Sequence, residues 1–145
     1  MNKKENFKDY KEWPFIEALK VLKKTESYKE KKTINFETGY GPSGIPHIGT
    51  FAEVLRTNMI INALKEITDT KIKLITFSDD LDALKKVPED YPYPDKLSHY
   101  INHPLSSIPD FTGKFASYAD RNNNLLKKFL GEFQFDYKFI SSTKE

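Results

Sequence analysis

The sequence predicts an α/β protein built on an incomplete doubly wound parallel sheet, with a helix before the sheet and a proline-rich insertion within it. Segments with helical and strand periodicity alternate along the chain as helix, strand, helix, strand, insertion, helix and strand. That βαβαβ order is half of a doubly wound parallel sheet. In addition, the second strand candidate, Lys71–Phe77, is mostly apolar through Ile72, Leu74, Ile75 and Phe77, as a strand buried in a parallel sheet would be.

The length and composition agree with one compact unit. The chain has 145 residues, of which 38% are hydrophobic and 30% charged, so it can form a core but not several domains. No stretch approaches the roughly 18 apolar residues that a membrane helix needs, and the first residues lack the apolar segment of a secretory signal. Because there is no cysteine, disulfides and thiolate metal sites are excluded.

The amino-terminal segment, residues 1–32, is basic and expected to contain a helix. It carries 10 lysines and 6 acidic residues, and Trp13–Lys24 has apolar side chains at helical spacing. Such a segment could contact a polyanion, although a lysine-rich face that is simply solvated is the more common outcome. Ser27–Lys32 is expected to be a polar connector.

Residues 33–145 are expected to form the sheet, its helices and an insertion at about 81–111. The insertion holds five prolines and little periodicity, and loops of this length in compact domains usually carry function. Two helices and three strands surround it, with Gly131 as a helix stop. The strands are Thr33–Thr38, Lys71–Phe77 and Phe135–Ile140, and the helices are Ile48–Ile67 and Gly113–Leu130.

A glycine- and proline-rich turn, residues 39–50, joins the first strand to the next helix and holds four of the six glycines. Glycines let backbone N–H groups approach a phosphate, and a helix N-terminus adds partial positive charge, so the turn predicts an anion site. It is neither a Walker A loop nor a Gly-x-Gly-x-x-Gly fingerprint. Instead His47 lies at the helix mouth, where its ring could donate to a phosphate oxygen or simply cap the helix. Gly49 leaves room for a purine or ribose.

Asp79 and Asp80 follow the second strand directly. Ligands of such sheets bind outside the carboxyl ends of the strands, so these carboxylates and the turn at residues 39–50 are expected at one edge. The alternative for the pair is a turn or a helix cap. Lys85 and Lys86 could approach a phosphate or a nucleic acid, and a solvated pair is an equal alternative.

Several segments resemble class I lysyl-tRNA synthetases, in order and over nearly the whole chain, from about Glu12 to Thr143. Thr38–Phe51 resembles their ATP-binding segment, and within it Pro46–Thr50 is similar to the His-x-Gly-His signature of class I enzymes. The other matching blocks are Trp13–Phe15, Phe77–Asp82 with Lys85–Pro88, Pro104–Asp110, and Phe135–Tyr137 with Ser141–Thr143. Thr50 stands where the general signature has a second histidine.

The resemblance implies a Rossmann-like catalytic domain whose first half is residues 33–145, in a cytoplasmic lysine–tRNA ligase. The implied reaction joins lysine and ATP, bound with Mg²⁺, into lysyl-adenylate, and then transfers lysine to tRNA-Lys. Catalysis would rest on positioning and charge stabilisation, with His47 and Thr50 as catalytic residues. The implied ATP-binding residues are Pro42, Ser43, Gly44, Pro46, His47, Gly49 and Thr50. The implied lysine-binding residues are Gly39, Tyr40, Asp79 and Asp80, and no metal site of the protein itself is implied.

Parts of that family are missing from these 145 residues, which contain no Lys-Met-Ser-Lys-Ser-like loop, no second half of the nucleotide fold and no anticodon-binding region. The sequence therefore predicts an amino-terminal catalytic fragment that is inactive alone. Two other functions stay open: a stand-alone nucleotidyltransferase, and a non-catalytic paralogue that binds nucleotide or tRNA.

Overall fold

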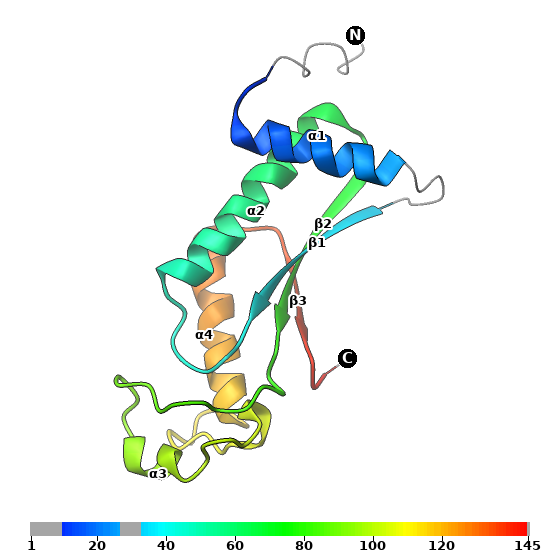
Figure 1. Ribbon diagram of the computed structural model, residues 1–145. Helices are drawn as coiled ribbons and strands as arrows, with labels where there is room; N and C mark the ends of the chain where they lie inside the picture. The colour runs from blue at the N-terminus through cyan, green and yellow to red at the C-terminus, as the bar shows by residue number, and fades with distance from the viewer. Residues whose placement is uncertain (1–9, 27–32, 145) are drawn as a thin grey trace.

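The computed structural model describes residues 10–26 and 33–144 and has the predicted α/β order (Figure 1). The expected connector Ser27–Lys32 and the first part of the basic segment lie outside these ranges. The helices are α1 (Trp13–Glu26), α2 (Ile48–Ile67), α3 (Pro94–Ser98) and α4 (Tyr118–Glu132). The strands are β1 (Thr33–Tyr40), β2 (Lys71–Ser78) and β3 (Lys138–Ser141).

The three strands form one parallel sheet in the order β1-β2-β3. Right-handed crossovers place α2 and α4 on the same face of such a sheet, and both lie on one side of it in Figure 1. Leu74 of β2 packs there with Val54 of α2 and Leu126 of α4. This half-sheet brings the carboxyl ends of β1 and β2 side by side, with Tyr40 opposite Ser78.

The helix α1 crosses α2 at the end of the molecule farthest from the strands' carboxyl ends (Figure 1). Ala18 of α1 is fully buried in a cluster with Ala63 and Leu64 of α2. Small residues at this crossing let the two helices approach closely. The predicted helix at Trp13–Lys24 is therefore confirmed, and it extends the hydrophobic core rather than lying free.

The segment between β2 and α4 has little regular structure but its own core. It contains only α3 and a short 3₁₀ turn at Leu105–Ser107. Fully buried side chains hold it together and join it to the start of α4; they include Leu84, Leu97, Leu105, Ile108 and Tyr118. The segment is thus packed against the sheet's carboxyl edge and forms one wall of the space there.

The predicted helix start at Gly113 is wrong, because α4 begins at Tyr118. The carboxylate of Asp110 accepts hydrogen bonds from the backbone N–H groups of Lys114 and Phe115, at 3.0 Å each, which closes a turn there. Gly113 has a φ of 70°, outside helical geometry. The helix starts only where the Ser117 hydroxyl caps the N–H of Asp120.

The predicted stop at Gly131 is also wrong, since α4 runs through it to Glu132. The chain turns at Gln134, whose φ of 56° is left-handed. Phe135, which was expected in the third strand, instead packs beside Phe133 and Phe51, so β3 begins only at Lys138. In contrast, β1 and β2 run slightly beyond their predicted ends.

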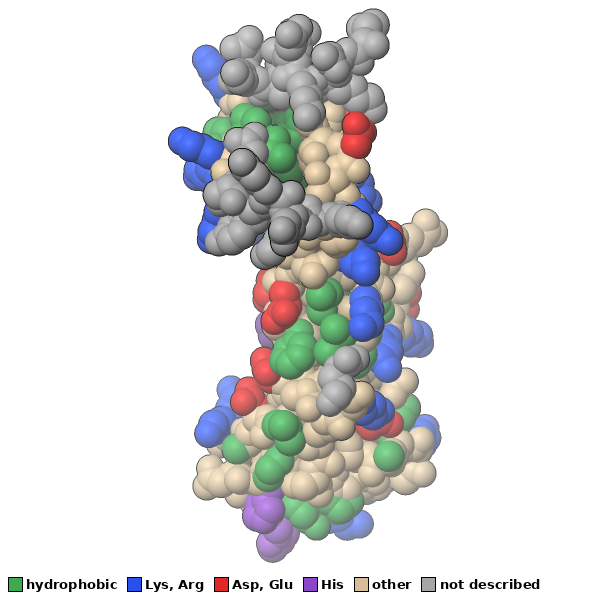
Figure 2. Space-filling model, turned by 90° about the vertical axis from the view of Figure 1, so that its right-hand side faces the viewer, with side chains coloured by type: hydrophobic (Ala, Val, Ile, Leu, Met, Phe, Trp, Pro, Cys, Tyr) green, Lys and Arg blue, Asp and Glu red, His purple; other side chains and the backbone are tan. Residues whose placement is uncertain are grey.

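The sheet face away from α2 and α4 carries half-buried Ile75, Phe77 and Ile140. Figure 2 shows the side of the molecule that bears the carboxyl terminus, where hydrophobic side chains lie between acidic and basic ones. Within residues 10–26 and 33–144, no helix is both long and apolar enough to cross a membrane.

Candidate functional site

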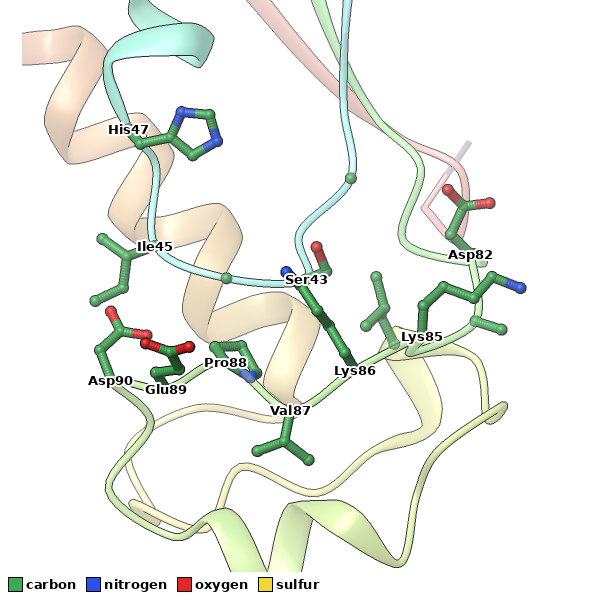
Figure 3. Close-up of a pocket in the computed structure, with 14 residues that line it drawn as sticks. Ser43, Ile45, His47, Asp82, Lys85, Lys86, Val87, Pro88, Glu89 and Asp90 are labelled. Atoms are coloured by element: carbon green, nitrogen blue, oxygen red, sulfur yellow. The ribbon is translucent and has the colours of Figure 1, made fainter.

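The candidate site lies at the carboxyl ends of β1 and β2, as the sequence predicts for this sheet. The turn after β1 separates two open cavities. The smaller, about 280 Å³, is lined by Gly39, Tyr40, His47, Thr50 and neighbouring loop residues. The larger, about 900 Å³, lies between the turn and the insertion (Figure 3). Ser43, Gly44 and His47 line both, and cavities of several hundred Å³ suit small-molecule ligands.

His47 is both the N-cap of α2 and a wall of the cavities. Its Nδ1 accepts a hydrogen bond of 3.0 Å from the N–H of Gly49, so in a neutral ring the hydrogen sits on Nε2. The ring is exposed. Capping and ligand binding, which were alternatives for the sequence, are therefore compatible, because the cap orients Nε2–H as a free donor.

The position of the His47 ring requires a glycine at residue 49. A Cβ at this position would lie 2.8 Å from Cε1 and 3.0 Å from Nδ1 of His47, closer than carbon atoms tolerate. The sequence predicts that Gly49 leaves room for a ligand. The structure adds that any side chain here would displace the capping histidine.

The other turn residues differ in what they expose. Ser43 is exposed, Thr50 is half-buried in the first turn of α2, and both line a cavity. Pro42 is buried, and neither Pro42 nor Pro46 lines either of these two cavities. The two prolines can therefore shape the turn but do not face the cavities.

Gly39 and Tyr40 end β1 beside the smaller cavity. The N–H of Gly39 donates to Oε1 of Glu53 on α2 at 3.2 Å, so a carboxylate braces this strand end. The Tyr40 ring belongs to the core, and its hydroxyl donates to the carbonyl of Gly44 at 2.8 Å. Burial raises the pKa of Tyr40 above its ordinary value, so the hydroxyl stays a protonated donor.

Asp79 and Asp80 have opposite surroundings. Asp79 is exposed beside Gly39. Asp80 is only 2% exposed, and its carboxylate accepts hydrogen bonds from the hydroxyls of Ser141, Ser142 and Thr143. Burial alone would raise the pKa of Asp80, but these hydrogen bonds outweigh it and hold that pKa below the ordinary value. Of the two carboxylates, only Asp79 has its side chain open to a ligand.

Lys85 and Lys86 both line the larger cavity. Figure 3 shows Lys86 extending toward Ser43 of the turn, whereas Lys85 extends away from it on the side of Asp82. Neither lysine has a hydrogen bond or ion pair with another residue in the described ranges. Glu89 and Asp90 lie at the other end of the cavity, below Ile45.

The arrangement can hold an anion between the turn, the start of α2 and Lys86, with carboxylates of Asp79 and Asp82 nearby for a cation. Among residues 10–26 and 33–144, no three His, Cys, Asp or Glu side chains are grouped to hold a metal ion.

Sequence reasoning missed several residues that build the site. Glu53 braces β1, and two side chains of α4, Tyr118 and Asn122, contact the turn from behind. A signal for Asn122 existed, because it follows Tyr118 by four residues on the apolar face of the helix, where an asparagine needs buried partners.

Comparison with known proteins gives a single answer. A family model described as "tRNA synthetases class I (K)" matches residues 11–145. The lysine–tRNA ligase of Roseobacter denitrificans is 53% identical over 135 residues, covering 92% of this chain and 26% of that protein. The lysine–tRNA ligase of Rickettsia prowazekii is 52% identical over 132 residues, covering 90% and 25%. The chain spans about a quarter of the length of these curated relatives.

Proposed function

We propose, since this chain belongs to the lysine family of class I tRNA synthetases, that it carries the ATP- and lysine-binding half-site of a lysine–tRNA ligase. The observation that supports this most directly is the position of His47. It caps α2 through Nδ1 while its Nε2 faces the space at the carboxyl ends of the strands. On this proposal residues 33–145 are the first half of the catalytic domain, and residues 1–32 are a basic segment in front of it that contains α1.

ATP, bound with Mg²⁺ as the substrate complex, occupies the space around the turn in this proposal. His47 donates from Nε2 to a phosphate oxygen, and Ser43, Gly44 and Thr50 line the same space. Gly49 keeps the histidine in place. The lysine carboxylate attacks the α-phosphorus, a P–O bond to lysine forms, and pyrophosphate leaves. The half-site binds and orients both reactants and stabilises negative charge on the phosphates.

Lysine binds next to Gly39 and Tyr40 in this proposal, with Asp79 as the carboxylate that receives an ammonium group. Asp80 is assigned a positioning role, because its oxygens are already engaged by Ser141, Ser142 and Thr143. Transfer to tRNA-Lys belongs to the activity of the relatives as whole proteins. We expect these 145 residues to bind ATP without forming lysyl-tRNA, since they contain no Lys-Met-Ser-Lys-Ser-like segment.

The test is calorimetric binding of Mg-ATP and of lysine to the purified chain. His47→Asn keeps a good N-cap and should weaken ATP binding by at least about tenfold, because a hydrogen bond to a charged group is worth roughly 1.5–3 kcal/mol. Asp79→Asn should weaken lysine binding and leave ATP binding unchanged. A wild-type chain that binds no ATP at millimolar concentration, or a His47→Asn variant that binds it normally, contradicts the proposal.

A further inference from the structure

Three consecutive carbonyl groups of the turn after β1 are tied back into the protein. The Pro42 carbonyl accepts from Asn122 Nδ2 at 2.8 Å, and the Ser43 carbonyl from the Tyr118 hydroxyl at 2.7 Å. The Gly44 carbonyl accepts from the Tyr40 hydroxyl at 2.8 Å. All three donors come from buried side chains, with Asn122 at 0% and Tyr118 at 1% exposed.

Because the peptide bond is planar, the direction of each carbonyl group also fixes the direction of the N–H group of the next residue. In a trans peptide the carbonyl of one residue and the N–H of the next point in opposite directions, and no described peptide bond is cis. Carbonyls drawn inward at residues 42–44 therefore turn the N–H groups of residues 43–45 outward. Ser43 N–H is used by the Gly41 carbonyl at 2.8 Å. The Gly44 and Ile45 N–H groups have no partner among the described residues.

Those two N–H groups lie on the turn that walls both cavities. Tyr118 and Asn122 line neither of these two cavities and are buried, so they contact the turn from the protein interior. Burial raises the pKa of Tyr118, as it does that of Tyr40, so both hydroxyls remain donors at neutral pH.

We propose that Tyr118 and Asn122 of α4, together with Tyr40, are positioning residues that hold the turn with its Gly44 and Ile45 N–H groups presented to the phosphates of ATP. Paired backbone N–H groups of this kind form anion-binding concavities. The inference rests on the proposed function for the identity of the ligand, whereas the ordering of the turn stands on the hydrogen bonds alone. The proposal predicts that the Tyr118 hydroxyl, which contacts the turn from the protein interior, affects the affinity for phosphate.

The experiment compares Tyr118→Phe with Tyr91→Phe. Tyr91 is 5% exposed and packs edge-on against Tyr118, with ring centres 5.2 Å apart, and its hydroxyl makes no hydrogen bond to the turn. The two variants remove the same atom from neighbouring buried sites. Binding of Mg-ATP and of adenosine, which lacks phosphates, is measured for wild type and both variants.

We expect Tyr118→Phe to weaken Mg-ATP binding about fivefold, as loss of one buried hydrogen bond that orders a binding loop does, and to leave adenosine binding unchanged. Tyr91→Phe should change neither. Equal losses for ATP and adenosine in Tyr118→Phe would indicate general destabilisation and overturn the inference, as would unchanged ATP binding.

A second measurement does not depend on the ligand. Backbone ¹⁵N relaxation at Gly44 and Ile45 reports order on the picosecond to nanosecond timescale. The double variant Tyr40→Phe, Tyr118→Phe should increase mobility at both amides, whereas Tyr91→Phe should not. If the wild-type chain binds no ATP, the proposed function is wrong and this measurement still decides the role of the three side chains. Unchanged mobility in the double variant overturns that role.

Discussion

At the scale of single residues, the two neighbouring lysines of the insertion differ in whether their side chain extends toward the proposed ligand site (Figure 3). Lys85 and Lys86 have the same side chain, line the same cavity, and have no ion-pair partner within the described ranges. Only Lys86 extends toward the turn at Ser43 (Figure 3). This difference in direction makes each lysine a control for the other.

We predict that Lys86→Ala weakens Mg-ATP binding about fivefold, because a charge pair exposed to solvent contributes roughly 1 kcal/mol. The loss should shrink as salt is raised, since exposed charges are screened. Lys85→Ala removes the same net charge and should have less than a twofold effect. Titration of both variants with ATP at low and high ionic strength checks this, and equal effects of the two changes would refute a directed role for Lys86.

At the scale of elements, Asp80 joins the ends of two strands. Its carboxylate accepts hydrogen bonds from Ser141 at the end of β3 and from Ser142 and Thr143 just after it. Its backbone carbonyl accepts from the N–H of Ser106 in the insertion at 2.9 Å. The β2 end, the β3 end and the insertion thus meet at Asp80, and its carboxylate joins the ends of the two strands. Its protonation state should therefore matter for stability.

We predict that stability contributed by Asp80 is lost in acid. The folded-state pKa of Asp80 lies below the ordinary value of 3.8, so the unfolded chain takes up the proton first. The contribution is then complete above about pH 5 and falls as the pH drops through the folded pKa. Asp80→Asn should lower the unfolding free energy by about 2 kcal/mol at pH 7, and its difference from wild type should shrink toward pH 3.

Chemical denaturation from pH 7 to pH 3 measures that difference. Asp79→Asn is the matched control, because it changes the adjacent exposed carboxylate and should alter stability by less than about 0.5 kcal/mol. Hydrogen bonds also hold the pKa of Asp110 below its ordinary value despite burial. Asp110 is present in the wild type and in both variants, so its contribution cancels in the differences between them. If the difference in unfolding free energy between wild type and Asp80→Asn is the same at pH 3 as at pH 7, ionisation of Asp80 does not supply this stability.

Helices and strands with strong periodicity were predictable from the sequence. The ends of helices were not predictable where a hydrogen bond from a side chain outside the helix fixes the local turn. The bounds of α2 follow from its apolar spacing. In contrast, α4 starts five residues later than predicted, because Gly113 lies in a turn closed by Asp110 and has a φ of 70°, outside helical geometry. The grouping of residues 39–50 at the sheet edge followed from the order of strands and helices. Which aspartate is open to a ligand did not, because it depends on hydroxyls some 60 residues away.

At the scale of the whole molecule, the sheet has an edge that no described segment covers. β1 is one of the two outer strands, and its eight residues make it the longer of them, since β3 has only four. The Gly39 N–H bonds to Glu53 rather than to β2, and N–H groups two residues apart in a strand point the same way. The N–H groups of Asn35 and Glu37 therefore also point outward, at an edge able to pair with another strand.

We predict that this edge makes the 145-residue chain self-associate at concentrations of tens of micromolar and above, as long uncovered edge strands do. Asn35→Pro removes an outward N–H without breaking the pairing of β1 with β2, and should leave the chain monomeric. Asn35→Ala keeps that N–H and should associate like wild type. Sedimentation velocity across a concentration series measures the association of the wild-type chain and of the two variants. A wild-type chain that stays monomeric, or a proline variant that associates equally, would place the cause of association elsewhere than at β1.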